Sequence, residues 1–160
     1  MNVLEHALQQ EKEARIYYEK LAKEAPNAEL RTIFTLLAEA EDSHYRALVA
    51  HRHQPGAARA ESNLLEASRN IFQQLLAQPE DDALKVDVDG YLRAVKAEEE
   101  SIRYYQRIAD QEPNPAAREL LLAIVEEERI HLNIIENIYE FVEAPRSYIE
   151  CLEFIPRESL

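Results

Sequence analysis

An acidic stretch near the C-terminal end contains two residues that could bind one metal ion. Glu128 and His131 are three positions apart, so on a helix they project from the same face about one turn from each other. The same Glu-x-x-His pair occurs 87 residues earlier, and a further glutamate lies 30 residues before each pair. The candidate metal ligands are therefore two sets of three: Glu11, Glu41 and His44, and Glu98, Glu128 and His131.

The repeat extends beyond these candidate ligands. Tyr17 and Tyr18 return as Tyr104 and Tyr105, and the Pro-Asn pair at residues 26–27 returns at residues 113–114. One Glu-x-x-His pair would be weak evidence in a chain so rich in glutamate. An offset that holds through aromatic, turn and acidic positions is not expected by chance, so we interpret the chain as one three-ligand motif used twice.

The elements that must position these ligands are amphipathic helices. Apolar residues recur at spacings of three and four in four segments, and the candidate ligands occupy positions where this pattern otherwise places leucine or phenylalanine. Pro26 and Pro113 interrupt the pattern and predict two helical hairpins, residues 2–53 and 87–143. Each proline stands midway between the two glutamates of its hairpin, so folding the chain back brings their carboxylates level.

Residues 54–86 connect the two hairpins. Pro55 and Gly56 end the second helix, and the apolar residues that follow predict a short amphipathic helix within the connector. A connector of this length can cross the length of a bundle. We therefore expect an all-α fold, a single domain over residues 1–160 in which an antiparallel four-helix bundle of two helical hairpins is joined by a long crossover. The apolar tail, residues 144–160, is expected to pack on the bundle or on a second subunit.

Composition excludes several classes of function. A net charge of −13 disfavours nucleic acid and anionic membranes as partners. Cys151 is the only cysteine, which excludes an intramolecular disulfide and a Cys-x-x-Cys metal site. The N-terminus lacks the pattern of a signal peptide, and no apolar run approaches membrane-spanning length. We expect a cytoplasmic protein, and a homodimer because the connector and tail leave apolar residues to cover.

Four carboxylates and two imidazoles inside an apolar core need a compensating positive charge. Two divalent cations would balance the four glutamates and leave one imidazole for each ion. Oxygen-rich ligation of this kind suits iron or manganese, although zinc remains an alternative. The competing interpretation, in which these side chains face solvent, requires the same coincidence on four helices. We expect Glu39, Glu126 and Glu127 to form a solvated face.

The repeated pattern resembles the di-iron carboxylate proteins of the ferritin-like superfamily. The run from Glu11 to Tyr18 is similar to the first helix of rubrerythrins, and the tail resembles that of small rubrerythrin-related proteins without a rubredoxin domain. The resemblance implies two iron ions per chain and assigns a role to each ligand. The terminal ligands would be Glu11 and Glu98, the bridging ligands Glu41 and Glu128, and the single imidazole of each iron His44 and His131.

The resemblance also implies what surrounds the iron and what the protein does. Tyr18 and Tyr105 match family tyrosines that hydrogen-bond to ligand carboxylates. Rubrerythrins carry an extra glutamate three residues after the third-helix ligand, where this chain has Ser101. The implied activity is reduction of hydrogen peroxide or dioxygen, with electrons from an external donor such as a rubredoxin-like or flavin protein. The alternatives are a ferroxidase or iron-binding protein that oxidises Fe²⁺ for storage or detoxification, and a bundle whose metal is structural.

Overall fold

The computed structural model describes residues 2–51, 57–77 and 88–143. These residues form five helices and no strand, which confirms the all-α prediction. The predicted tail and both ends of the predicted connector lie outside the described residues. The helices are α1 (Val3–Glu24), α2 (Ala28–Ala50), α3 (Ala57–Leu76), α4 (Val88–Gln111) and α5 (Pro115–Glu143).

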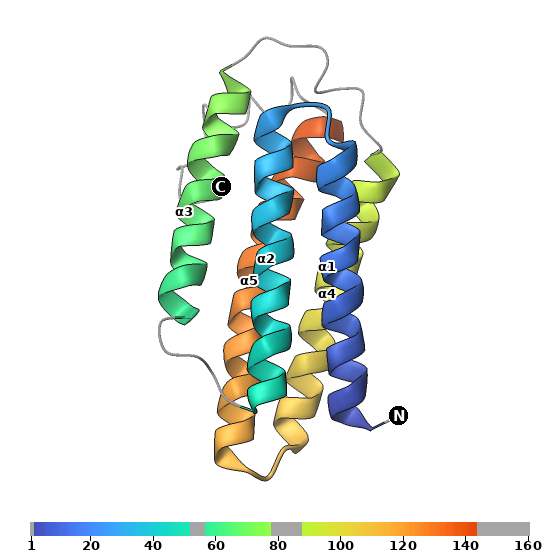
Figure 1. Ribbon diagram of the computed structural model, residues 1–160, viewed down its shortest axis with the longest axis vertical. Coiled ribbons are helices and arrows are strands. Elements are labelled where there is room, and N and C mark those ends of the chain that lie inside the picture. Colours follow the sequence, from blue (N-terminus) through green and yellow to red (C-terminus); the bar gives the residue numbers. More distant parts are fainter. Residues whose placement is uncertain (1, 52–56, 78–87, 144–160) are drawn as a thin grey trace.

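Two antiparallel hairpins make up the bundle, α1 with α2 and α4 with α5 (Figure 1). Each second helix begins with an asparagine cap after the turn proline. The side chain of Asn27 accepts a hydrogen bond of 2.9 Å from the Leu30 N–H, and that of Asn114 accepts one of 3.0 Å from the Ala117 N–H. These bonds satisfy N–H groups that have no partner inside the helix, so the caps define where the chain turns back.

The crossover helix α3 lies along the outside of the bundle against α2 and α5 (Figure 1). Phe72 of α3 is buried, and its ring meets that of Phe141 edge to face at 5.6 Å between centroids. The sequence predicts a short helix here, but α3 has 20 residues. Its first turns, from residue 57 to 61, consist of alanine, arginine and glutamate, which form helix readily without an apolar stripe.

The apolar core is divided into two clusters by a polar layer. The first surrounds Phe34 and Ile134 near the α1–α2 turn, and the second surrounds Leu48 and Leu121 at the opposite end. On each of the four bundle helices, the candidate ligands fall between residues of the first cluster and residues of the second. The polar layer is therefore enclosed by hydrocarbon above and below.

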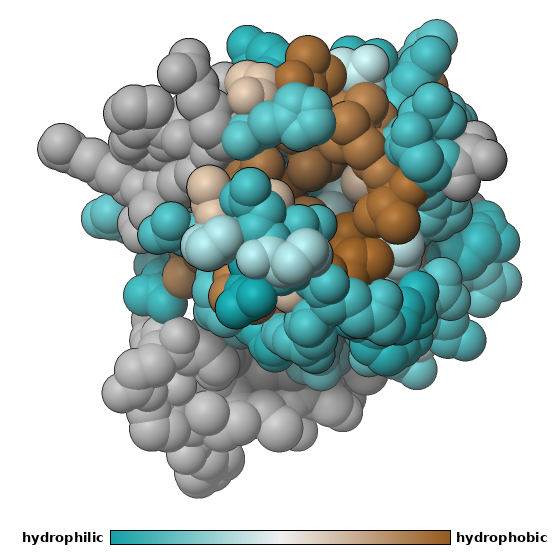
Figure 2. Space-filling model, turned by 90° about the horizontal axis from the view of Figure 1, so that it is seen from below, coloured by the Kyte–Doolittle hydropathy of each residue, from teal (hydrophilic) through white to brown (hydrophobic). Residues whose placement is uncertain are grey.

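The end of the bundle where α1 begins carries apolar side chains at its surface. Seen from this end, apolar side chains gather within a ring of hydrophilic ones (Figure 2). Val3 and Val49, 57% and 53% exposed, lie at the start of α1 and the end of α2. Within the part of the chain that the structure describes, no helix combines the length and the apolar character needed to cross a membrane.

Candidate metal centre

The six candidate ligands lie together in the polar layer, and each is at most 3% exposed. Their donor atoms form two groups, each compact enough to hold one ion. The first group takes one residue from α1, two from α2 and one from α5, and the second takes one each from α2 and α4 and two from α5. The groups are Glu11, Glu41, His44 and Glu128, and Glu41, Glu98, Glu128 and His131. Glu41 and Glu128 belong to both groups, the arrangement that bridging ligands require.

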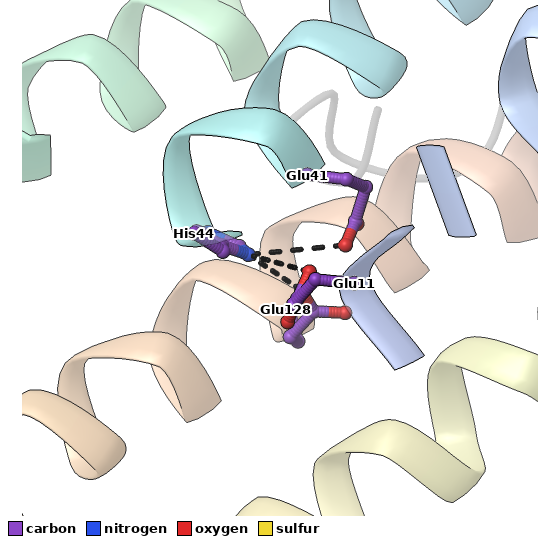
Figure 3. A group of neighbouring side chains, drawn as sticks. All are labelled: Glu11, Glu41, His44 and Glu128. Carbon is purple, nitrogen blue, oxygen red and sulfur yellow. Dashed lines mark ion pairs between the residues drawn. The ribbon is translucent and has the colours of Figure 1, made fainter. Parts of the chain in front are cut away.

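Figure 3 shows the first group, in which the ring of His44 faces three carboxylates. Its Nδ1 atom lies 2.8 Å from Oε1 of Glu128, 3.6 Å from Oε2 of Glu11 and 3.9 Å from Oε2 of Glu41. Because a single ring atom faces all three carboxylates, Nδ1 is the atom that can share an ion with them.

The second group mirrors the first. Nδ1 of His131 lies 2.7 Å from Oε1 of Glu41 and 3.8 Å from Oε1 of both Glu98 and Glu128. The two imidazole rings are stacked, with 5.3 Å between centroids and 10° between planes. Each histidine therefore makes its shortest contact in the cluster with the shared glutamate of the other hairpin. The duplicated sequence motif becomes a site only when the two hairpins pack together.

Two tyrosines hold the carboxylates that belong to one group only. The Tyr18 hydroxyl donates a hydrogen bond of 2.6 Å to Glu98, and the Tyr105 hydroxyl donates one of 2.7 Å to Glu11. Both tyrosines are buried, and the pKa of each phenol is raised well above its ordinary value. Burial is the largest cause, and the negative charge of the nearby carboxylates is the second. They therefore remain protonated donors. Each bond crosses from one hairpin to the other, so the tyrosines fix the carboxylates and join the hairpins at once.

Glu127 corrects the sequence prediction of a solvated face. Glu39 and Glu126 are exposed as expected, but Glu127 is only 6% exposed and its Oε2 lies 2.7 Å from Nε2 of His44. The repeat missed it because the matching position is Ala40. Helical spacing could have found it, since residue 127 lies three after the buried Ile124 and four before His131. Glu127 contacts the ring nitrogen opposite the one that faces the cluster.

Burial and mutual repulsion set the charge state of the metal-free cluster. The pKa values of Glu41 and Glu98 are both raised well above the ordinary value. Burial is the largest cause, and the negative charge of Glu128 is the second. Burial alone would lower the pKa of His44, but the surrounding carboxylates, Glu11 first, outweigh it and raise the pKa well above normal. Without a bound cation, protons on these groups therefore reduce the negative charge of the cluster.

Divalent cations fit this donor set. Among the described residues, Oε2 of Glu11 and Oε2 of Glu98 are buried without a hydrogen-bond partner. No lysine or arginine is buried in the described part of the chain to offset the carboxylates. Orphaned buried oxygens of this kind are costly unless something binds them. A pair of ions that prefer oxygen donors and accept one imidazole each would satisfy them.

Comparison with known proteins agrees with this chemistry. A sequence model of the rubrerythrin family matches residues 2–139, a span that includes all six candidate ligands and both tyrosines. No curated protein and no solved structure gives a significant match.

Proposed function

The chain belongs to the rubrerythrin family, and from this premise we propose that it is a di-iron oxidoreductase that reduces a peroxide or dioxygen with electrons from an external donor. The observation that carries the proposal is the pair of four-residue groups that share Glu41 and Glu128. Two ions held by common carboxylates can deliver two electrons to one substrate molecule, which a single isolated ion of iron or manganese cannot do as readily.

In this proposal, one ion would be held by the group that contains His44 and the other by the group that contains His131, and Glu41 and Glu128 could serve both ions. When bound, the iron pair supplies reversible two-electron redox chemistry. The chain binds and orients: Tyr18 and Tyr105 hold Glu98 and Glu11 by short hydrogen bonds. Such bonds keep a ligand carboxylate in one orientation while the charge of the metal changes. The apolar clusters above and below the layer limit the access of water along the axis of the bundle.

The electron donor is a separate protein in this proposal. A rubredoxin-like or flavin protein in the cytoplasm would serve, because either can pass single electrons to a buried centre. The alternative function is a ferroxidase that oxidises Fe²⁺ for storage or detoxification. It is favoured by the near-symmetric ligand groups, each with one imidazole, and by Ser101 at the position of the additional rubrerythrin glutamate.

Rapid mixing distinguishes these functions. The protein is loaded anaerobically with two Fe²⁺ per chain and mixed separately with hydrogen peroxide and with dioxygen. Faster oxidation by peroxide, with iron that stays bound and can be reduced again, supports the oxidoreductase. Faster oxidation by dioxygen with continued uptake of Fe²⁺ supports the ferroxidase. Absence of oxidation by either reagent contradicts both and leaves a structural metal.

A further inference from the structure

We propose that a cavity between α1 and α4 is a binding site for small, uncharged organic hydroperoxides, which the iron pair then reduces. The inference rests on the proposed oxidoreductase function and names a substrate class for it. The cavity has a volume of about 300 Å³ and is lined by residues of α1 and α4, with Glu41 and Glu128 at its inner end. It therefore leads from the surface of the bundle to the candidate metal centre.

The size of the cavity exceeds what hydrogen peroxide needs. A water molecule takes up about 30 Å³ in the liquid, so a peroxide with two oxygen atoms would fill a small fraction of the space, even with two ions at the inner end. Sites for small organic molecules begin at about 300 Å³. The volume fits a compact hydroperoxide with a branched alkyl group.

Small side chains create this space. Ala94, Ala97 and Ser101 follow one another at spacings of three and four on the face of α4 that also carries Glu98. Ala14 of α1 also lines the cavity. Helices α1 and α4 belong to different hairpins and approach each other much less closely than the helices within a hairpin. An alkyl group can therefore lie between the helices where larger side chains would otherwise pack.

The charge around the cavity selects an uncharged ligand. Glu13 and Glu100, which match each other in the repeat, are exposed residues of the cavity wall, and the whole chain carries a net charge of −13. This field repels anionic peroxides. Further inside, the wall contains the unpartnered oxygens of Glu11 and Glu98. A neutral hydroperoxide can place its alkyl group against the alanines and its peroxide oxygens toward the metal centre.

The reaction balances with the components already proposed. The O–O bond of the hydroperoxide breaks as it accepts two electrons from the iron pair, and the two oxygen atoms take up two H⁺ in total from the buffered solvent. The products are one alcohol and one water molecule, and the external donor returns the two electrons. No additional oxidant or reductant is required.

The test compares two peroxides on variants that fill the cavity. The diferrous protein is mixed with tert-butyl hydroperoxide or with hydrogen peroxide in a stopped-flow instrument. Ala97→Leu and Ser101→Leu each place a branched side chain in the space for the alkyl group. Because each leucine would occupy part of the space that the alkyl group needs, oxidation by tert-butyl hydroperoxide should slow by about tenfold or more, and oxidation by the smaller hydrogen peroxide by less than about threefold. Ala116→Leu, at an exposed position of α5 outside the cavity, is the matched control.

Binding is measured apart from turnover. Tert-butyl alcohol, which has the shape of the substrate, is added to zinc-loaded protein and followed by NMR. The resonances of Ala97 and Ser101 should shift in a saturable manner, and Ala97→Leu should abolish the saturation. Iron content and thermal unfolding of each variant show whether it has kept its fold. Because residues 97 and 101 lie on different turns of α4, a variant that fails to fold at one position leaves the other to test the proposal.

The outcomes separate this inference from the function on which it rests. Oxidation by hydrogen peroxide but not by tert-butyl hydroperoxide overturns the inference and leaves the oxidoreductase intact. Equal slowing of both peroxides by Ala97→Leu also overturns it, because the cavity would then be a general entry route. If neither peroxide oxidises the protein, peroxide reduction is ruled out as its function, and the NMR titration alone decides whether the cavity binds such a molecule.

Discussion

Glu127 makes the two candidate metal positions unequal in a cluster that is otherwise nearly symmetric. It approaches His44 from the side opposite the cluster, and the matching position in the repeat is Ala40. A carboxylate that accepts the second N–H of a metal-bound imidazole fixes the ring orientation and makes the other nitrogen a stronger donor. The ion beside His44 should therefore be held differently from the ion beside His131.

We expect Glu127→Ala to weaken binding of one of the two metal ions by about 10- to 100-fold, because partners of ligand histidines contribute affinity on that scale. Titration of the metal-free protein with Co²⁺, followed by its visible spectrum, resolves the two binding steps. Glu126→Ala is the matched control, since the Glu126 side chain is 76% exposed. Glu127→Gln, which keeps an acceptor oxygen, should recover part of the loss. Equal weakening of both steps would contradict a role specific to His44.

The ligand assignment is tested at the same scale. Glu41→Ala removes a carboxylate common to both groups, and His131→Ala removes the imidazole of one group. Glu41→Ala should lower the content of both metals, whereas His131→Ala should lower the content of one. Elemental analysis after purification measures both effects. Unchanged metal in both variants would show that the assignment is wrong.

Tyr18→Phe probes a bond between the hairpins. It removes the hydroxyl that donates to Glu98 and leaves that buried carboxyl oxygen without this donor. An unsatisfied buried acceptor costs about 1–3 kcal/mol, so urea unfolding of the metal-free variant should show a loss of that size. Tyr104→Phe is the control, because the Tyr104 hydroxyl donates to the Val3 carbonyl near the surface over 3.2 Å. Equal losses for the two variants would mean that the buried bond adds no stability of its own.

At the scale of elements, α3 covers the bundle without contributing a ligand. Its buried residues Leu64, Phe72 and Leu75 join the core cluster near the α1–α2 turn. The four ligand-bearing helices are already paired within their hairpins, and α3 seals the seam between α2 and α5. Stability and metal binding should therefore be separable by substitutions in α3.

We expect Phe72→Ala to lower the free energy of unfolding by about 3–5 kcal/mol, the usual cost of truncating a buried phenylalanine. The number of metal ions bound per chain should remain that of the unmodified protein, because the residue lies in α3, outside the helices that carry the candidate ligands. Chemical denaturation and metal analysis of the same sample test both parts. Loss of metal in a variant that is still folded would show that α3 also shapes the site.

At the scale of the whole molecule, the buried cluster of glutamates and histidines makes the stability of the folded protein depend on pH. The raised pKa values of Glu41, Glu98 and His44 mean that the folded, metal-free protein holds protons that the unfolded chain releases. Stability from such groups is present at low pH and is lost as the pH rises through the folded-state pKa values. The net charge of −13 acts in the same direction through self-repulsion.

The metal-free protein should therefore melt at a lower temperature at about pH 8 than at about pH 6, because over this range the folded cluster holds more protons than the unfolded chain does. A bound cation would replace those protons, so the stabilisation on adding Mn²⁺ should be larger at the higher pH. Differential scanning calorimetry with and without chelator gives both values. A melting temperature of the metal-free protein that rises with pH would contradict this charge balance.

The homodimer stays a prediction. The exposed apolar side chains at the end of the bundle where α1 begins, including Val3 and Val49, are a surface that a second copy could cover. Light scattering at micromolar concentration should give the mass of two chains. A mass of one chain would contradict the dimer.

The sequence by itself determined the ligand types and the elements that carry them. The repeat selects six residues out of a glutamate-rich chain, and the turn prolines and capping asparagines define the hairpins. These signals are local or periodic, so they can be read along one chain. They place each side chain on a face of its own helix, which is sufficient for residues that all face the bundle axis.

Only the tertiary structure decided what each side chain meets from another helix. Tyr18 bonds to Glu98 of the other hairpin, and Glu127 lies behind His44 of α2. The cavity exists because small residues of α1 and α4 line the same space. Periodicity along one helix does not specify which neighbour occupies the opposite face, because that depends on how the hairpins rotate against each other to bury their apolar stripes. The contacts around the candidate metal centre, and the cavity beside it, arise at this step.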